Sequence, residues 1–133
     1  MKLITRDTDY AVRALAFIAG KKGKIVSAAE LVAELGMPRP FLRKILQVLN
    51  KKGTLKSFKG KGGGFSLGLS SSKIYLVDLI ETFQGPLKLN ECFFKKMLCP
   101  NRKNCALRRK IGNIESRVVS ELKTISLASL LKG

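Results

Sequence analysis

The stretch that decides the fold runs from Ser27 to Leu69 and reads SAAELVAELGMPRPFLRKILQVLNKKGTLKSFKGKGGGFSLGL. Ser27 followed three residues later by Glu30 is the capping-box signature of a helix start, and Gly36 is suited to end that helix. A second helix is predicted from about Phe41 to Lys52, because apolar residues recur there at spacings of three and four. Two short helices joined by a turn that contains Gly and Pro predict a helix-turn-helix.

A β-hairpin is predicted directly after this pair of helices. Leu55 to Phe58 and Phe65 to Leu69 have the composition of strands, and the glycine-rich segment from Gly60 to Gly64 joins them. A hairpin that follows the second helix of a helix-turn-helix is a wing. The sequence therefore predicts a winged helix-turn-helix.

Further helices are predicted on both sides of this unit. Residues 7–19 form an amphipathic pattern whose start could be capped by Asp7, Thr8 or Asp9. The polar link from Ser70 to Ser72 is expected to cap a fourth helix over residues 74–83.

A single long amphipathic helix is predicted near the C-terminus. Its narrow apolar seam, whose residues are spaced by three or four, predicts pairing with a second copy of the chain. The seam consists of Leu107, Ile111, Ile114, Val118, Leu122 and Ile125. We expect a mainly α (α+β) homodimer with a DNA-binding domain over 1–86, a cysteine loop over 87–105, and a dimerisation helix and tail over 106–133.

The composition points to a polyanionic partner. The chain has 133 residues, 45% of them hydrophobic, with a formal net charge of +17. Nucleic acid is the expected partner, because no amphipathic basic helix suited to an anionic membrane surface is found. No signal peptide is recognised at the N-terminus, so a cytoplasmic location is expected, where the three cysteines do not form a disulfide framework.

Basic residues concentrate on the two elements that a winged helix presents to double-stranded DNA. The segment from Arg39 to Lys61 contains eight cations and no acid: Arg39, Arg43, Lys44, Lys51, Lys52, Lys56, Lys59 and Lys61. Arg43 is the best candidate for reading a base, because arginine can donate two parallel hydrogen bonds to guanine. Lys59 and Lys61 are suited to the minor groove or to phosphates. The alternative is a solvated basic face with no partner.

The cysteines form a candidate soft-ligand site. Cys92, Cys99 and Cys105 are spaced C-x6-C-x5-C, with cations nearby, which suits iron–sulfur chemistry or zinc. The spacing matches neither a zinc ribbon nor a ferredoxin motif. The alternative is that the thiols are small buried apolar groups.

The chain resembles the bacterial family of iron–sulfur transcriptional regulators that includes IscR and NsrR (the Rrf-two family). The resemblance rests on five segments in order: Thr8–Leu15, Phe41–Leu46, Lys61–Phe65, Glu81–Pro86 and the three-cysteine loop. It covers nearly the whole chain. It implies a dimeric winged-helix regulator in which the three cysteines hold a 2Fe-2S or 4Fe-4S cluster.

The resemblance also bears on a fourth ligand and on the operator. IscR-like members use a histidine three residues after the last cysteine, but Arg108 stands there and the chain has no histidine. NsrR-like members use an aspartate supplied by the other subunit, which matches Asp9, and Glu91, water or a small thiol are alternatives. Arg43 stands where IscR has an acid, so the operator of IscR cannot be assumed.

These observations predict a sequence-specific DNA-binding regulator, a repressor, modulated by a cluster that senses nitric oxide, redox or iron status. One alternative is a cluster-free regulator that uses its cysteines as a thiol redox switch or zinc site. Another is a winged helix that docks with other proteins. An enzyme is not expected, because the chain has no histidine and no nucleophile with a base beside it.

Overall fold

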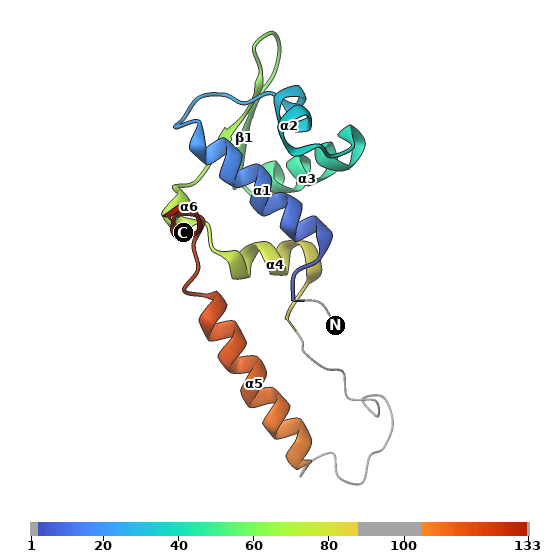
Figure 1. The fold of residues 1–133 in the computed structure, drawn as a ribbon, viewed down its shortest axis with the longest axis vertical. Helices are drawn as coiled ribbons and strands as arrows, with labels where there is room; N and C mark the ends of the chain where they lie inside the picture. The colour runs from blue at the N-terminus through green and yellow to red at the C-terminus, as the bar shows by residue number, and fades with distance from the viewer. Residues whose placement is uncertain (1–2, 88–104, 133) are drawn as a thin grey trace.

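The computed structural model describes residues 3–87 and 105–132. The elements in chain order are α1 (Arg6–Gly20), α2 (Ala28–Leu35), α3 (Arg39–Lys51), β1 (Leu55–Phe58), β2 (Gly64–Leu67), the 3-10 turn η1 (Ser71–Lys73), α4 (Leu76–Gln84), α5 (Ala106–Leu122) and α6 (Leu127–Lys132). Figure 1 shows α1 to α4 and the hairpin in one body, with α5 extending away from it. The predicted winged helix-turn-helix, mainly helical with one antiparallel hairpin, is confirmed.

The helix-turn-helix forms where local chemistry predicts it. The Ser27 hydroxyl accepts a hydrogen bond from the Glu30 N–H at 3.1 Å, which satisfies one of the free donors at the start of α2. Gly36 ends α2 in the left-handed conformation with φ 66°, which glycine adopts without steric cost.

One hydrophobic core holds the winged helix-turn-helix together. It is built from the buried faces of α1 and α3, with contributions from α2, β1 and α6. Its fully buried large side chains include Leu15, Ile18, Leu31, Leu42, Leu46, Leu49, Leu55 and Leu127. Because α3 buries one face in this core, its opposite face is left for solvent or a partner.

Two sequence predictions about helix ends are wrong. The serines 70–72 do not cap α4: they form η1, and α4 starts after Tyr75 without a side-chain cap. Nor does an aspartate or Thr8 cap α1: the N-cap is Thr5, and its side chain makes no capping hydrogen bond to the backbone. Asp7, Thr8 and Asp9 all lie inside the helix.

The single long C-terminal helix is also corrected. The chain leaves α5 at Leu122, forms an isolated antiparallel bridge between Tyr75 and Ser126, and re-enters a helix at Leu127. The Leu76 N–H donates to the Ile125 carbonyl at 2.9 Å, and the Leu127 N–H donates to the Ile74 carbonyl at 2.7 Å. The end of the chain is therefore attached to the start of α4.

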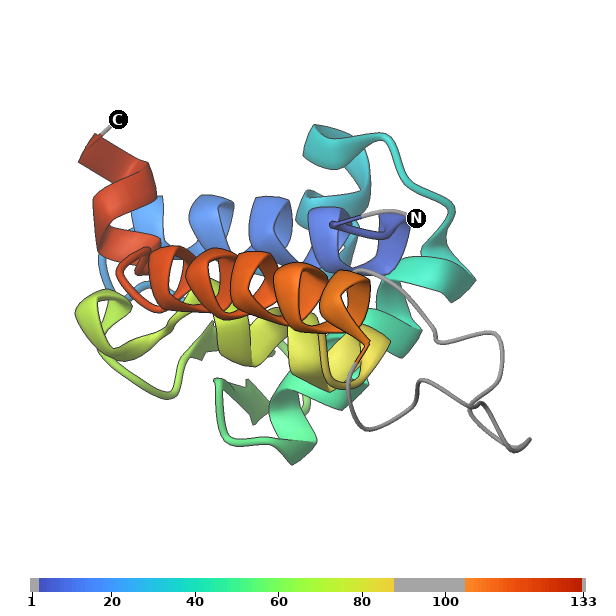
Figure 2. The same cartoon turned by 90° about the horizontal axis from the view of Figure 1, so that it is seen from below.

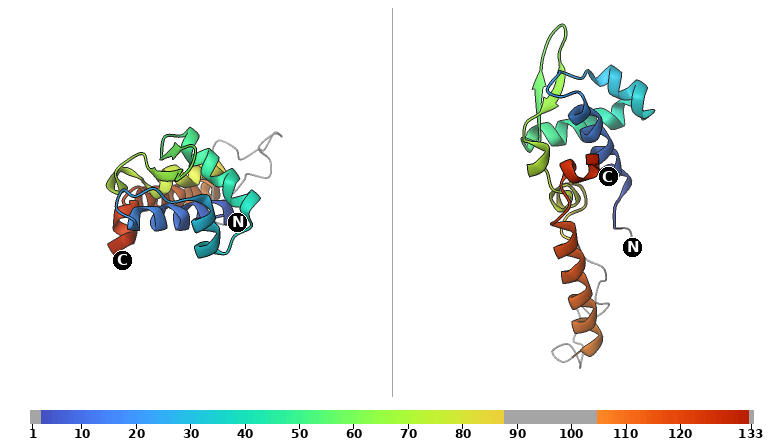
Figure 3. Two further views of the ribbon diagram at one scale, coloured as in Figure 1. Left: turned by 90° about the horizontal axis from the view of Figure 1, so that it is seen from above. Right: turned by 60° about the vertical axis from the view of Figure 1, so that its left-hand side comes forward.

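The predicted seam of α5 is covered only at its C-terminal end. Leu122 is buried in a second apolar cluster with α4, and Val118 packs against that cluster. Leu107 is 68% exposed and Ile114 is 48% exposed. The N-terminal end of α5 and the hairpin loop project from opposite ends of the molecule (Figures 1 and 3).

Candidate nucleic-acid interface and cysteine site

The exposed face of α3 carries the cations that the sequence analysis selected. Arg39, Arg43, Lys44 and Lys51 are all exposed, while Leu42, Ile45, Leu46 and Leu49 are buried on the other side. The helix begins after Pro38, whose carbonyl accepts the Leu42 N–H at 3.1 Å, and Pro40 occupies its first turn, where a missing N–H has little cost. The four cations therefore lie on one solvent-facing surface of a rigid helix.

The hairpin adds a second group of cations beside this surface. Its register pairs Leu55 with Leu67 and Phe58 with Gly64, and Leu55 enters the core. Lys56 on β1 and Lys59 and Lys61 in the loop are exposed. These are the wing lysines that the sequence analysis selected.

Close backbone contacts fix the position of this wing. Phe65 and Val26 exchange two backbone hydrogen bonds of 2.8 Å, which tie β2 to the segment before α2. A Cβ at Gly64 would lie 2.3 Å from the Val26 carbonyl oxygen, and one at Gly63 would lie 2.2 Å from the Phe58 carbonyl oxygen. Only glycine fits at these two positions without a backbone shift.

The charges of α3 and the wing are not neutralised by ion pairs that the structure shows. Over residues 3–87 and 105–132 the ion pairs are Asp9 with Arg13 and Lys21 with Glu30. Neither uses a cation of α3 or of the wing. This surface therefore presents its positive charge to solvent, as a polyphosphate ligand requires.

Of the predicted cysteine ligands, only Cys105 lies in the described part of the chain. Cys105 is the N-cap of α5, and its sulfur accepts a hydrogen bond from the Arg108 N–H at 3.5 Å. The side chain is partly exposed. Cys92 and Cys99, like the alternative ligand Glu91, lie outside the described residues.

Asp9 lies in the first turn of α1, with its carboxylate partly exposed. Its Oδ2 accepts a hydrogen bond from Arg13 Nε at 3.0 Å, one helical turn further along. Within residues 3–87 and 105–132 no group of three or more histidine, cysteine, aspartate or glutamate side chains is arranged to hold a metal ion.

Sequence reasoning missed two side chains next to these sites. Arg6 at the start of α1 lies over the ring of Phe41 in α3, and Gln84 at the end of α4 accepts hydrogen bonds from Thr5 and Thr8. Both contacts join residues that are more than thirty positions apart. A local sequence pattern does not predict such pairs, although Gln84 belongs to Glu81–Pro86, one of the segments on which the family resemblance rests.

Comparison with known proteins identifies the family. A model of the Rrf2 family, described as iron-dependent transcriptional regulators, matches residues 4–133. The chain belongs to the Rrf2 family. It is therefore a transcriptional regulator rather than an enzyme, and a helix-turn-helix DNA-binding fold is expected of it.

Relatives support the Rrf2 assignment. A protein of Aquifex aeolicus (strain VF5), named as an HTH-type transcriptional regulator, is 32% identical over 132 residues, which covers 97% of this chain and 92% of that protein. The protein aau3 of Rhizobium meliloti (strain 1021) is 28% identical and is covered over 85% of its length, with 98% of this chain.

Solved Rrf2 structures share the fold. CymR, the global cysteine regulator of B. subtilis, superimposes with a TM-score of 0.83 at 22% identity, over 99% of this chain and 98% of CymR. IscR of T. potens superimposes with a TM-score of 0.75 at 24% identity, over 99% of this chain and 87% of IscR. An oxidized form of Staphylococcus aureus CymR superimposes with a TM-score of 0.76 at 20% identity, over 100% of this chain and 98% of that chain.

The described helices include none with the length and apolar character of a membrane span.

Proposed function

We propose that this Rrf2 protein is a homodimeric repressor that binds operator DNA through α3 and the wing. The observation that carries the proposal is the set of exposed cations on these two elements, which meet no acid in the described structure. In this arrangement α3 enters the major groove, Arg43 reads a base edge, and Lys59 and Lys61 bind the sugar–phosphate backbone. Arg39, Lys44, Lys51 and Lys56 add contacts of the same kind.

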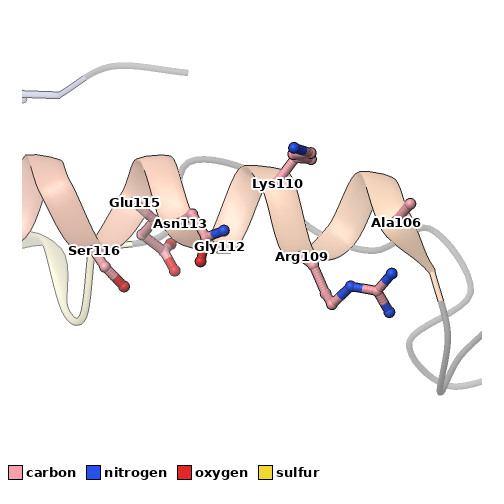
Figure 4. A pocket seen from close by; sticks show the side chains of 7 residues that line it. All are labelled: Ala106, Arg109, Lys110, Gly112, Asn113, Glu115 and Ser116. Atoms are coloured by element: carbon pink, nitrogen blue, oxygen red, sulfur yellow. The ribbon is translucent and has the colours of Figure 1, made fainter.

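Dimerisation is proposed to use the N-terminal half of α5. Leu107 and Ile114 are exposed there, on the part of the seam that α4 does not cover. A depression on the same half of α5, lined in the described structure by residues such as Arg109, Asn113 and Ser116 (Figure 4), contains neither of these two seam residues. A second α5 packed along the seam would cover the exposed side chains of Leu107 and Ile114.

The dimer proposal has a direct test with a matched control. Leu107→Glu combined with Ile114→Glu should shift the protein from dimer to monomer in sedimentation velocity. Leu130→Glu changes another apolar side chain, 44% exposed, on α6, and should leave the dimer intact. A double variant that stays dimeric would contradict the proposal.

The cysteines are proposed to hold an iron–sulfur cluster. The chemistry of the described donors fits: a thiol sulfur at a helix N-terminus, where negative charge is favoured, and a partly exposed carboxylate. Cys92, Cys99 and Cys105 would be the thiolate ligands, and Asp9 of the partner subunit the fourth ligand. When bound, such a group supplies iron that reacts with nitric oxide or oxygen.

The chain's own residues would convert this chemistry into a change in DNA affinity. Asp9 lies on α1, and α1 packs against α3 in the main core. A ligand bond at Asp9 therefore constrains the helix that supports the DNA-reading helix. Because half-sites recur about 34–36 Å apart, a shift in the spacing of two α3 helices weakens binding. Switching between nearly full and nearly empty occupancy needs a difference of about 5.5 kcal/mol in DNA binding.

A second candidate is a thiol redox switch without iron, or a zinc site. It draws support from the three cysteines themselves and from the oxidized form in which a CymR with the same fold was solved. In this case oxidation of the thiols, rather than loss of a cluster, would alter the position of α5.

One experiment separates the two candidates. Protein purified without oxygen is analysed for iron, sulfide and zinc, and its visible spectrum and affinity for promoter DNA are recorded before and after nitric oxide. The cluster proposal predicts iron and sulfide, visible absorption and a nitric-oxide-dependent loss of affinity. Iron-free protein whose affinity responds to a thiol oxidant would contradict the cluster and support the switch. Equal affinity in all states would contradict both forms of regulation and leave DNA binding intact.

A further inference from the structure

Arg6 of α1 is held over the start of the DNA-reading helix. Its guanidinium carbon lies 4.7 Å from the centroid of the Phe41 ring, within the range of a cation–π contact. The ring of Tyr10, one helical turn after Arg6, meets Phe41 edge to face, with centroids 5.5 Å apart and an interplanar angle of 90°. An aromatic pair that joins α1 to α3 therefore fixes the position of this arginine.

A second cation lies beside Arg6 in the same groove. Lys44 follows Phe41 by three residues, so the two are neighbours on the surface of α3. The described residues that line the groove are Arg6, Tyr10, Pro38, Pro40, Phe41 and Lys44. The lining holds two cations on an aromatic and proline floor and no acid. Neither cation takes part in the ion pairs between described residues.

The groove lies at the opposite end of α3 from the wing. Phe41 is in the first turn of α3, whereas β1 starts four residues after the helix ends. A helix inserted in the major groove has a phosphate strand on each side of it. In the proposed arrangement the wing binds one of these strands, which leaves the groove at the N-terminal end of α3 for the other.

We propose that Arg6 and Lys44 bind a backbone phosphate of the DNA duplex, with Phe41 as the platform for Arg6. The inference rests on the proposed function, because it assumes that α3 enters the major groove. It adds a binding residue from α1, outside the helix-turn-helix and the wing. Arginine suits this position, because its planar group stacks on a ring and still directs donors at two phosphate oxygens. The contact with Phe41 orients the side chain before DNA arrives, which lowers the entropic cost of binding.

The test measures binding to a random-sequence duplex across a series of salt concentrations. Arg6→Gln removes the charge and keeps the length of the side chain, and Arg6→Lys keeps the charge and loses the planar group. Lys132→Gln is the control: it removes an exposed cation from α6, which lies on the other side of the body from the hairpin (Figures 2 and 3). Thermal unfolding of every variant checks that the fold is kept.

The slope of log affinity against log salt should be smaller for Arg6→Gln by about 0.9 for each lost phosphate contact. Arg6→Lys should keep the slope of the parent with weaker binding, and Lys132→Gln should match the parent in both. Phe41→Leu should weaken binding without changing the number of cations. A folded Arg6→Gln variant with the affinity and slope of the parent would overturn the proposal. If the parent itself showed no salt-dependent binding, the proposed function would fail, and the inference with it.

Discussion

The carboxylate of Asp9 and the guanidinium of Arg13 form an ion pair of 3.0 Å on the exposed side of α1. The acid precedes the base by four residues, the favourable orientation on a helix, and both side chains are about half exposed or more, at 46% and 63%. Such exposed pairs contribute only about 0.3–0.5 kcal/mol to stability. Asp9 can therefore leave Arg13 for a metal ligand bond at little cost to the fold.

Asp9→Asn should leave the folding stability of the metal-free protein within about 0.5 kcal/mol of the parent, because it removes only an exposed pair. In protein that has been loaded with a cluster, the same change should alter the visible spectrum and shorten the lifetime of its absorption. Urea unfolding and anaerobic spectroscopy measure the two effects. Asp7→Asn, on the same helical turn, is the matched control and should change neither. An Asp9→Asn protein with the spectrum and lifetime of the parent would remove Asp9 from the ligand set.

Gln84 and Thr8 should behave as a coupled pair in unfolding experiments. The fully buried Thr8 hydroxyl donates to Gln84 Oε1 at 2.7 Å, and the same oxygen accepts the Thr5 N–H at 2.9 Å. Gln84→Leu removes the acceptor of this N–H and leaves the Thr8 hydroxyl only its longer contact with Thr5 Oγ1 at 3.4 Å, which should cost about 1–3 kcal/mol. In that background Thr8→Val should be close to neutral, since the orphaned hydroxyl is then gone. Additive losses in the double-mutant cycle would contradict the coupling.

Gly64→Ala should destabilise the hairpin and its attachment to the core. The new methyl would lie 2.3 Å from the Val26 carbonyl oxygen, which belongs to backbone and can move only with the bridge between Val26 and Phe65. A loss of roughly 1–3 kcal/mol is expected in chemical denaturation. Gly20→Ala is the control, because nothing lies within 4 Å of a Cβ there, and it should not destabilise. Equal stabilities for the two variants would show that Gly64 is not constrained.

Local chemistry allowed most of the winged helix-turn-helix to be predicted. Ser27, Gly36 and the spacing of Leu42, Ile45 and Leu46 each act within a few residues, so their effect is readable from the chain alone. The exposed cations of α3 and the wing followed from the same reasoning, because the apolar face of a helix determines which residues remain outside.

Contacts between distant segments were not predictable in this way. The break after Leu122 arises from backbone pairing between Tyr75 and Ser126, while Ile125 continues the apolar spacing as if the helix went on. A local sign was present: Ser126 and Ser129 exchange side-chain hydrogen bonds with each other's N–H at 3.0 and 3.1 Å, the capping geometry of a new helix. Arg6 and Gln84 contact residues that are distant in the sequence, and the periodicity of apolar residues does not predict such contacts.

The central claim is that the cations of α3 and the wing bind DNA. The most direct measurement compares the parent with a variant that carries both Arg43→Gln and Lys59→Gln, on a promoter fragment over a range of salt concentrations. We predict a marked loss of affinity and a smaller salt dependence, because a base contact and a phosphate contact disappear from each subunit. A folded double variant that binds the fragment as tightly as the parent, with the same salt dependence, would contradict the account.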